Sequence, residues 1–269
     1  MLIAQITDLH IGREGASPDN DRRLDQVMAR IADHHPDVIL ATGDLTEGGA
    51  PEAFARVKAR LSALAVPVLP VVGNHDRREA LLDAFGLAAD DAGFVQYVRD
   101  LDDLRLIVLD TIEVGRHGGA FCERRAAWLQ ARLDEAPTRP TLIALHHPPF
   151  KTAIAWMDEP AGGPWSQRLL EALEGRGQVV GLVAGHLHRP VAARFAGHPF
   201  VIAPSVAPQL VLDLDEAPPR AFRPRIIAEP PGFALHLWRD GCLVSHFASA
   251  SDSRVIAGYD PQTGLIVPT

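Results

Sequence analysis

The sequence of 269 residues predicts an α/β fold in which two mixed sheets pack face to face with helices outside. Short apolar runs alternate with segments of helical periodicity, which is typical of sheets with crossover helices. Most of these runs stop at Gly, Asp, Asn or His, and the pattern occurs twice with no linker between the halves. We expect one domain over residues 1–248 with a β-rich C-terminal part. Residues 249–269 would form a tail that docks on this body or on a partner subunit.

Strands and helices alternate regularly in the first half. Strands are expected at residues 2–7, 38–41 and 66–72, where apolar and β-branched residues gather. The first helix is indicated by Leu24, Val27 and Ile31, which recur at helical spacing before Pro36. Pro51 suits the first turn of a second helix reaching about residue 64, and a short third helix covers residues 77–85.

The second half repeats the pattern and then becomes rich in strands. Strands are expected at residues 104–109, 141–145 and 178–184, with helices over residues 123–135 and from Pro164 onward. Short β segments follow near residues 191–196, 199–203, 208–214, 233–238 and 242–247. Because these segments lack helical spacing and are separated by Gly and Pro, the C-terminal part is predicted to be mainly β.

Composition excludes several classes of partner. The net charge is −8, from 26 basic and 34 acidic residues with no long Lys/Arg run, so a nucleic-acid polymer is not expected as a partner. The two cysteines, Cys122 and Cys242, form no CxxC pair, which favours a reducing cytoplasm over a disulfide framework. No apolar run reaches the roughly 18 residues of a membrane span.

Potential metal ligands follow five of the predicted strands. Asp44 alone could be a turn residue after its strand. The full set has mixed nitrogen and oxygen chemistry without thiolates, which suits Zn²⁺, Mn²⁺ or Fe. Seven ligands are too many for one tetrahedral ion and suit two ions that share a carboxylate. In an extended chain, Asp-x-His would put both side chains on one side. The seven are Asp8, His10, Asp44, Asn74, His146, His186 and His188.

The order of these motifs resembles that of the calcineurin-like metallophosphoesterases. The five matching blocks are Asp8-Leu9-His10, Gly43-Asp44, Gly73-Asn74-His75-Asp76, His146, and Gly185-His186-Leu187-His188. Within that superfamily the chain most resembles bacterial class III cyclic nucleotide phosphodiesterases and related glycerophosphodiesterases, on Leu109-Asp110-Thr111, the Gly-rich loop 115–119, and His146-His147-Pro148-Pro149. The resemblance implies a four-layer αββα sandwich and a dinuclear metal site.

The resemblance also implies a role for each residue. Asp8, His10, Asp44 and His188 would hold one metal, and Asp44, Asn74, His146 and His186 the other, with Asp44 as the bridge. His75 would face the phosphate, and Asp76 would orient His75. We therefore take His75, Asn74 and Asp76 as the catalytic candidates. The cofactors would be two ions per chain, Mn²⁺, Fe²⁺/Fe³⁺ or Zn²⁺, and a hydroxide bridging them would attack phosphorus.

The expected function is hydrolysis of small phosphodiesters, either 3',5'-cyclic nucleotides or glycerophosphodiesters. One alternative is a broad-specificity phosphomonoesterase. Another is a binding protein that keeps the fold without catalysis, which the intact ligand set opposes. By the same resemblance we expect a homo-oligomer, with a dimer as the specific prediction.

Three positions near the motifs concern the substrate. His146 is preferred over its neighbour His147 as the ligand, and His147 is assigned to loop support or substrate contact. His117, in the Gly-rich loop, is either a surface residue or a substrate contact, and it is kept among the substrate-binding candidates with His75 and His147. Relatives often carry a substrate-side His where this chain has Pro208, so the substrate preference is open.

Overall fold

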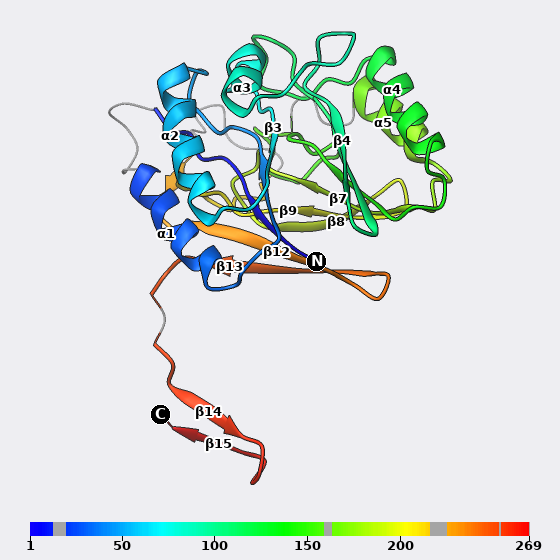
Figure 1. The fold of residues 1–269 in the computed structure, drawn as a ribbon. Coiled ribbons are helices and arrows are strands. Elements are labelled where there is room, and N and C mark those ends of the chain that lie inside the picture. Colours follow the sequence, from blue (N-terminus) through cyan, green and yellow to red (C-terminus); the bar gives the residue numbers. More distant parts are fainter. Residues whose placement is uncertain (13–19, 159–162, 216–224, 253, 269) are drawn as a thin grey trace.

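Two large sheets pack face to face, with helices on both outer faces (Figure 1). This arrangement is seen in a computed structural model of the chain, which describes residues 1–12, 20–158, 163–215, 225–252 and 254–268. Helices α1 (Asn20–Ala32), α2 (Pro51–Leu61) and α3 (Arg78–Phe85) lie on one side, and α4 (Glu123–Asp134) and α5 (Pro164–Leu173) lie on the other. The predicted four-layer αββα sandwich is confirmed.

The first sheet has five strands and mixed direction. In spatial order they are β13 (Cys242–Ser249), β12 (Gly232–Arg239), β1 (Leu2–Ile6), β2 (Val38–Thr42) and β3 (Val68–Val71). Strands β1, β2 and β3 run parallel, whereas β12 pairs antiparallel with both β1 and β13. The C-terminal strands therefore return to the N-terminal half of the fold.

The second sheet has six strands. In spatial order they are β4 (Tyr97–Leu101), β5 (Leu104–Val108), β6 (Thr141–Ala144), β7 (Val179–Ala184), β9 (His198–Ile202) and β8 (Val191–Phe195). The inner strands β5, β6, β7 and β9 are parallel, and the two edge strands are antiparallel to their neighbours. Strand β4 was not predicted, because its Arg99 and Asp100 are exposed and interrupt the apolar pattern.

The central strands are buried on both faces because their side chains alternate between two cores. In β2, Val38 and Leu40 point between the sheets, whereas Ile39 and Ala41 pack beneath the helices α1 and α2. Strand β5 divides its residues in the same way between the intersheet core and the core under α4 and α5. This double burial explains the nearly continuous apolar runs in the sequence.

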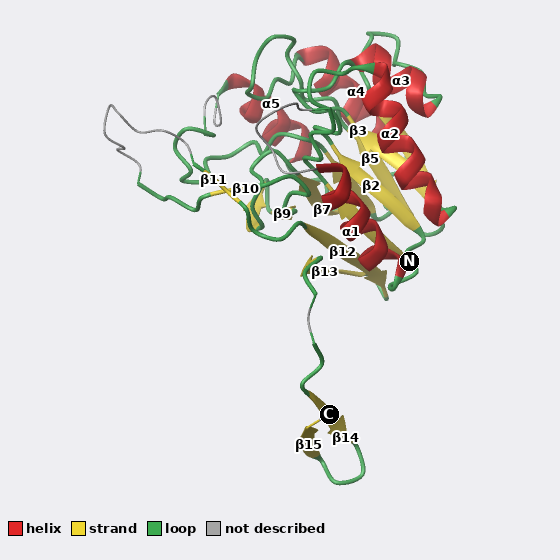
Figure 2. Ribbon diagram, turned by 90° about the vertical axis from the view of Figure 1, so that its left-hand side faces the viewer, coloured by secondary structure: helices red, strands yellow, loops and turns green. Residues whose placement is uncertain are grey.

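The loops that follow the parallel strands gather at one end of the sandwich (Figure 2). The short ladder of β10 (Gln209–Leu210) and β11 (Ile226–Ile227) lies at the same end. At this edge the loops bring together side chains from both sheets, as expected at the carboxyl ends of strands.

The C-terminal hairpin lies apart from the sandwich (Figure 1). It consists of β14 (Ala257–Asp260) and β15 (Leu265–Pro268), which pair antiparallel. Its side chains Tyr259, Leu265 and Ile266 are exposed. Among the described residues, no helix combines the length and apolarity needed to cross a bilayer.

Candidate metal centre and active site

The ends of β1 and β7 contribute one group of ligand candidates from opposite sheets. His188 Nε2 lies 3.1 Å from His10 Nε2 and 3.5 Å from an Asp8 carboxylate oxygen. The backbone N–H of His186 donates to the Asp8 carboxylate at 3.0 Å, which fixes the two strand ends together. Asp8, His10 and His188 offer ligand atoms that all lie within 4.8 Å of one another.

Asp44, after β2, lies between this group and a second one. Its Oδ2 lies 3.7 Å from His10 Nε2 and 3.3 Å from His146 Nε2. The other oxygen, Oδ1, accepts the backbone N–H of His75 at 2.8 Å, which fixes the carboxylate. Among the described side chains that could hold a metal, Asp44 forms clusters both with His10 and with His146. This position suits a carboxylate that bridges two ions.

The second group surrounds His146, which follows β6. Asn74 Oδ1 lies 3.2 Å from His146 Nε2, and the His186 ring lies 5.1 Å from that of His146. His146 is fully buried, and His186 is 8% exposed. The structure thus brings together all seven side chains that the sequence predicts as ligands, from the loops that follow β1, β2, β3, β6 and β7.

The imidazoles of three predicted ligands each direct Nδ1 at an oxygen acceptor. With Nδ1–H donating to that acceptor, Nε2 is the atom that faces the centre, where it can hold a proton or a metal ion. The pairs are His10 with the Glu47 carboxylate at 2.7 Å, His146 with the Thr42 carbonyl at 2.8 Å, and His188 with the Pro208 carbonyl at 2.9 Å.

These tautomers fit a cation. The two lone pairs of His10 Nε2 and His188 Nε2 face each other at 3.1 Å. His146 Nε2 faces the oxygens of Asp44 and Asn74, so this nitrogen carries either a proton or a metal ion. Acceptors that face acceptors repel one another unless a proton or a metal ion lies between them. The oxygen and nitrogen donors match the preferences of Zn²⁺, Mn²⁺ and Fe. The residues therefore fit the metal cofactor that the sequence predicts.

Charge coupling in the cluster perturbs its carboxylates. Burial raises the pKa of Asp8 to about 6, opposed by His146 and reinforced by the nearby charge of Asp44. Burial also acts to raise the pKa of Asp44, but the positive charge and hydrogen bond of His146 hold it well below its usual range. Because these two shifts are opposite in direction, Asp8 takes up a proton before Asp44 does as the pH falls.

Most of the predicted ligands have left-handed backbone geometry. The φ angles of Asp8, His10, Asp44, His186 and His188 are +52°, +46°, +50°, +74° and +53°. The sequence interpretation placed Asp8 and His10 on one side of an extended chain, and that geometry is wrong. Sharp turns after the strands aim both side chains at the centre instead. Such strained residues gather at functional sites.

Two glycines allow the ligand loops to approach one another at the centre. A Cβ at Gly73 would overlap the backbone and carboxylate of Asp44, and one at Gly185 would overlap Thr7 and Asp8. The glycines in the Gly-Asn-His-Asp and Gly-His-x-His motifs are thus required for the close packing of ligand loops.

His75 is held by Glu47, which sequence reasoning missed. Glu47 Oε1 lies 3.2 Å from His75 Nδ1, while its Oε2 binds His10. The hydrogen bonds from His10 and His75 hold the pKa of Glu47 far below its usual value. Burial acts to lower the pKa of His75, but the hydrogen bond to Glu47 raises it overall. The position of Glu47, three residues after Asp44, was the available sequence signal.

Asp76 has a different role from the predicted one. Its carboxylate accepts the backbone N–H groups of Leu45, Thr46 and Gly73 at 3.1, 2.9 and 3.0 Å, and it also accepts the Thr46 hydroxyl. It therefore joins the two loops that carry Asp44 and Asn74. The expectation that Asp76 orients His75 is corrected, because the orienting contact comes from Glu47.

The three substrate-side positions have distinct surroundings. His147 is buried, with Nδ1 2.9 Å from the Thr111 hydroxyl and Nε2 3.0 Å from the carbonyl of His117. These contacts attach the Gly-rich loop to β6. The His117 ring lies 5.7 Å from that of His75 and lines the cavity. Pro208 contributes only its main-chain carbonyl, to His188.

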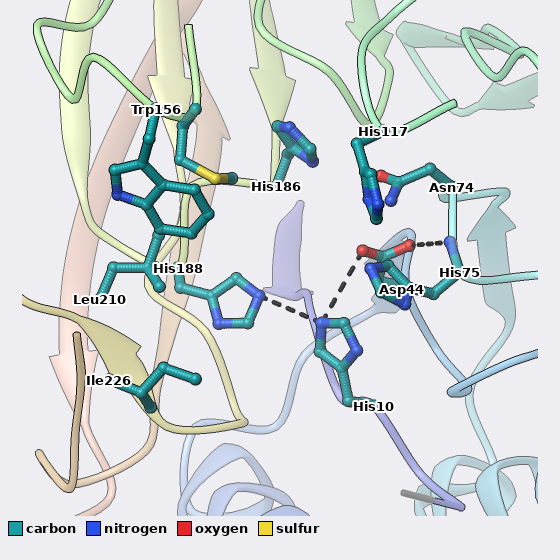
Figure 3. Close-up of a pocket in the computed structure, with 11 residues that line it drawn as sticks. His10, Asp44, Asn74, His75, His117, Trp156, His186, His188, Leu210 and Ile226 are labelled. Atoms are coloured by element: carbon teal, nitrogen blue, oxygen red, sulfur yellow. Dashed lines mark hydrogen bonds and ion pairs between the residues drawn. The ribbon is translucent and has the colours of Figure 1, made fainter. Parts of the chain in front are cut away.

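A cavity of about 340 Å³ opens over the centre. In Figure 3, His10, Asp44, Asn74, His75, His117 and His186 surround one side, and Trp156, Leu210 and Ile226 line the other. A cavity of this volume lies within the range of small-molecule binding sites.

Comparisons with known proteins agree with the fold and the centre. A sequence model of the family described as calcineurin-like phosphoesterase matches residues 1–190. The chain is 36% identical to a probable cyclic nucleotide phosphodiesterase of Rhodopseudomonas palustris over 80% of this chain and 81% of that protein. It is 29% identical to a probable glycerophosphodiester phosphodiesterase of Arcobacter nitrofigilis, over 89% of each chain.

A solved structure supports the fold independently. The structure of a dimetal phosphatase from Danio rerio superposes with a TM-score of 0.71 and 17% identity, over 93% of this chain and 96% of that chain. At this identity the likeness concerns the fold alone. From the family match, the sequence relatives and the convergent histidines and carboxylates, the chain belongs to the calcineurin-like phosphoesterase family.

Proposed function

We propose that this protein is a metal-dependent phosphodiesterase that hydrolyses small phosphodiesters, such as 3',5'-cyclic nucleotides or glycerophosphodiesters. The names of its sequence relatives support this class of reaction, since one is called a cyclic nucleotide phosphodiesterase and another a glycerophosphodiester phosphodiesterase. The convergent cluster and the cavity above it support hydrolysis of a small ester.

The observation that carries the proposal is the approach of two imidazole lone pairs. His10 Nε2 and His188 Nε2 lie 3.1 Å apart while both Nδ1 atoms face oxygen acceptors. A cation between them offsets the repulsion. One ion would be held by Asp8, His10, Asp44 and His188, and a second by Asp44, Asn74, His146 and His186. Their identity is proposed as Mn²⁺, Fe²⁺/Fe³⁺ or Zn²⁺.

Ions at these positions would supply Lewis acidity toward the phosphate oxygens and would lower the pKa of water. The chain's own residues position the ester. The amide of Asn74 and the ring of His75 line the cavity beside Asp44. The raised pKa of His75 favours its protonated form, which can donate to a phosphate oxygen or to the departing alkoxide.

Hydrolysis of matched esters tests the proposal. The metal-loaded chain should hydrolyse bis(p-nitrophenyl) phosphate, 3',5'-cyclic AMP or glycerophosphoethanolamine faster than p-nitrophenyl phosphate, a monoester. His75→Asn should lower kcat at least tenfold while metal content stays unchanged. His34→Asn, at an exposed position after α1, is the control and should behave as wild type. Faster hydrolysis of the monoester than of every diester would contradict the proposal.

We also propose a homodimer in which the tail docks on the partner subunit. Exposed apolar side chains on the hairpin, Tyr259 at 68% and Ile266 at 76%, support this, as do Val244 and Phe247 on the edge strand β13. Light scattering of the full chain and of a chain ending at residue 248 tests it. A dimer that becomes a monomer without the tail is expected.

The free Cys122 and Cys242 support a reducing compartment such as the cytoplasm.

A further inference from the structure

The cavity over the metal centre has two chemically different sides (Figure 3). One side carries the polar groups described above. The other is made by Trp156, Met157, Leu210 and Ile226, which we call the apolar wall. None of the proposed catalytic steps uses this wall. Its side chains would therefore contact a substituent of the ester that takes no part in the reaction.

The tryptophan comes from a loop that is fixed by a partly buried hydrogen-bond network. The Asp158 carboxylate accepts the backbone N–H of Thr152 at 2.8 Å, the Thr152 hydroxyl at 2.7 Å and the backbone N–H of Ala153 at 2.9 Å. The backbone N–H of Met157 donates to Ile154 at 2.8 Å. These bonds close a turn that presents Trp156 and Met157 to the cavity.

The remaining part of the wall is attached to the proposed metal site. Leu210 of β10 pairs with Ile226 of β11 across an antiparallel ladder. Two residues before Leu210, the Pro208 carbonyl accepts His188 Nδ1 at 2.9 Å. Arg189 donates to the Leu210 carbonyl at 2.6 Å. The wall and the metal-facing histidine are therefore positioned by the same short segment.

Two of the four side chains in the apolar wall are exposed, which supports a role in binding a ligand. Trp156 is 39% exposed and Ile226 is 60% exposed, although both lie beside a cavity. Apolar side chains exposed together next to polar groups are typical of binding sites. The indole N–H is the one strong hydrogen-bond donor among the four side chains. Hydroxyl groups such as those of glycerol would lose hydrogen bonds to water at this wall and gain few hydrogen bonds to the protein, which disfavours their binding here.

We infer that the apolar wall is a subsite for a planar aromatic substituent of the phosphodiester, such as a nucleobase, and that it selects such esters over diesters of glycerol. The inference rests on the proposed phosphodiesterase function. A flat indole face favours a ring over a flexible alkyl chain because two rings stack in parallel. The thioether of Met157 also packs well against rings.

Two substrates that differ only in the ring test this inference. One is adenosine 3',5'-cyclic phosphate, and the other is the same ribose cyclic phosphate without a base. For the wild-type chain loaded with Mn²⁺, kcat/KM should be about tenfold higher with adenine, a typical contribution of one base stacked on an aromatic side chain. Trp156→Ala should reduce this ratio to below about threefold and leave hydrolysis of the base-free ester and of glycerophosphoethanolamine unchanged.

Matched variants separate the loss of ring stacking from a general loss of folding or activity. Trp156→Phe should keep most of the adenine preference because it keeps a flat ring. Trp128→Ala removes an indole on α4 that packs against Arg132 and should change neither substrate. Binding of the products by calorimetry gives a readout independent of turnover. Adenosine 5'-monophosphate should bind about tenfold more tightly than ribose 5-phosphate to wild type, and equally to Trp156→Ala.

Distinct outcomes would contradict the inference and the proposed function. Equal kcat/KM for both cyclic esters in wild type, or an equal loss for both in Trp156→Ala, would overturn the aromatic subsite alone. The aromatic subsite would also be overturned if a cyclic ester with an alkyl group in place of adenine had a kcat/KM as high as that of the adenine ester. If the metal-loaded chain hydrolysed no diester at all, the proposed function would fail, and the substrate inference would fail with it.

Discussion

Glu47 Oε1 lies 3.2 Å from His75 Nδ1, so the cavity histidine is held by a carboxylate on the loop of Asp44. The other oxygen of Glu47 lies 2.7 Å from His10 Nδ1. One side chain thereby orients both a proposed metal ligand and the residue proposed to donate to the phosphate. A carboxylate that fixes the tautomer of a ligand histidine also raises its basicity.

Glu47→Gln should weaken both contacts. The amide oxygen of Gln can accept from one histidine, but its N–H₂ group then faces the other histidine. That ring can no longer donate its Nδ1–H, so the tautomer with the proton on Nδ1 is no longer favoured. We expect metal affinity or kcat to fall about 10- to 100-fold. The alkaline limb of the pH–rate profile should also move to lower pH, because the hydrogen bond that raises the pKa of His75 and keeps it protonated is weakened. Metal titration and kcat between pH 5 and 9 measure these effects.

A matched control for this variant is Glu52→Gln. Glu52 is an exposed residue in the first turn of α2, and its replacement should leave metal affinity and kcat unchanged. If Glu47→Gln had the activity, metal affinity and pH profile of wild type, then Glu47 would not position these histidines.

Asp76→Ala should destabilise the fold. It removes an acceptor shared by three backbone N–H groups and one hydroxyl in a buried position. Buried donors left without partners are each worth about 1–3 kcal/mol, so the free energy of unfolding should fall by roughly 3 kcal/mol. Urea denaturation measures this. Unchanged stability with complete loss of turnover would instead favour the catalytic role expected from the sequence.

Gly185→Ala should prevent assembly of the metal centre. The added Cβ would overlap the Thr7 hydroxyl and the Asp8 carboxylate, which the backbone N–H of His186 also binds. We expect loss of metal binding and a lower melting temperature. Gly177→Ala is the control, since a Cβ there meets no atom within 4 Å and no positive φ is involved. Wild-type metal content in Gly185→Ala would show that the sheets can separate at little cost.

His236 should make stability depend on pH. Its ring is fully buried between the Gln5 amide oxygen and the Ser245 hydroxyl, each 2.8 Å away, and burial lowers its pKa to about 4. The unfolded chain, with an ordinary pKa of about 6.5, binds the proton first. Stability is therefore present above pH 6.5 and is lost as the pH falls toward 4.

Replacing His236 with Gln isolates this effect from other titrating groups. Between pH 7.5 and pH 5, the wild-type free energy of unfolding should fall by about 2 kcal/mol more than that of His236→Gln. Urea denaturation at the two pH values gives both numbers. An identical fall in the two proteins would mean that the native protein binds a proton at His236 as readily as the unfolded chain does.

The layers of the fold could be predicted because doubly buried strands leave a strong signal. Apolar runs such as that ending at Thr42 alternate between two cores, and the polar residues after them mark the ligand edge. The pairing of β12 with β1 could not be predicted, because it joins residues 229 to 235 positions apart. Strand β4 gave no signal because none of its five residues is fully buried and two of them are exposed.

The site was predictable in its ligand types and not in its supporting contacts. Asp8 and His10 could be placed by motif, but their left-handed φ angles occur in a turn whose backbone N–H groups donate to the carbonyls of Gly43 and Asp44 after β2. Glu47 and Asp76 are both acids near Asp44 in space, and only their geometry separates the residue that orients His75 from the residue that ties the loops. The apolar wall was missed for the same reason, since Trp156 and Ile226 lie 70 positions apart.

The central claim is that Asp44 serves two metal ions at once, and metal content measures it most directly. After dialysis against Mn²⁺, wild type should hold about two ions per chain and hydrolyse bis(p-nitrophenyl) phosphate. Asp44→Asn should lose both ions and turnover, whereas His186→Asn should keep about one ion. Retention of two ions, or of wild-type turnover, in Asp44→Asn would contradict the account.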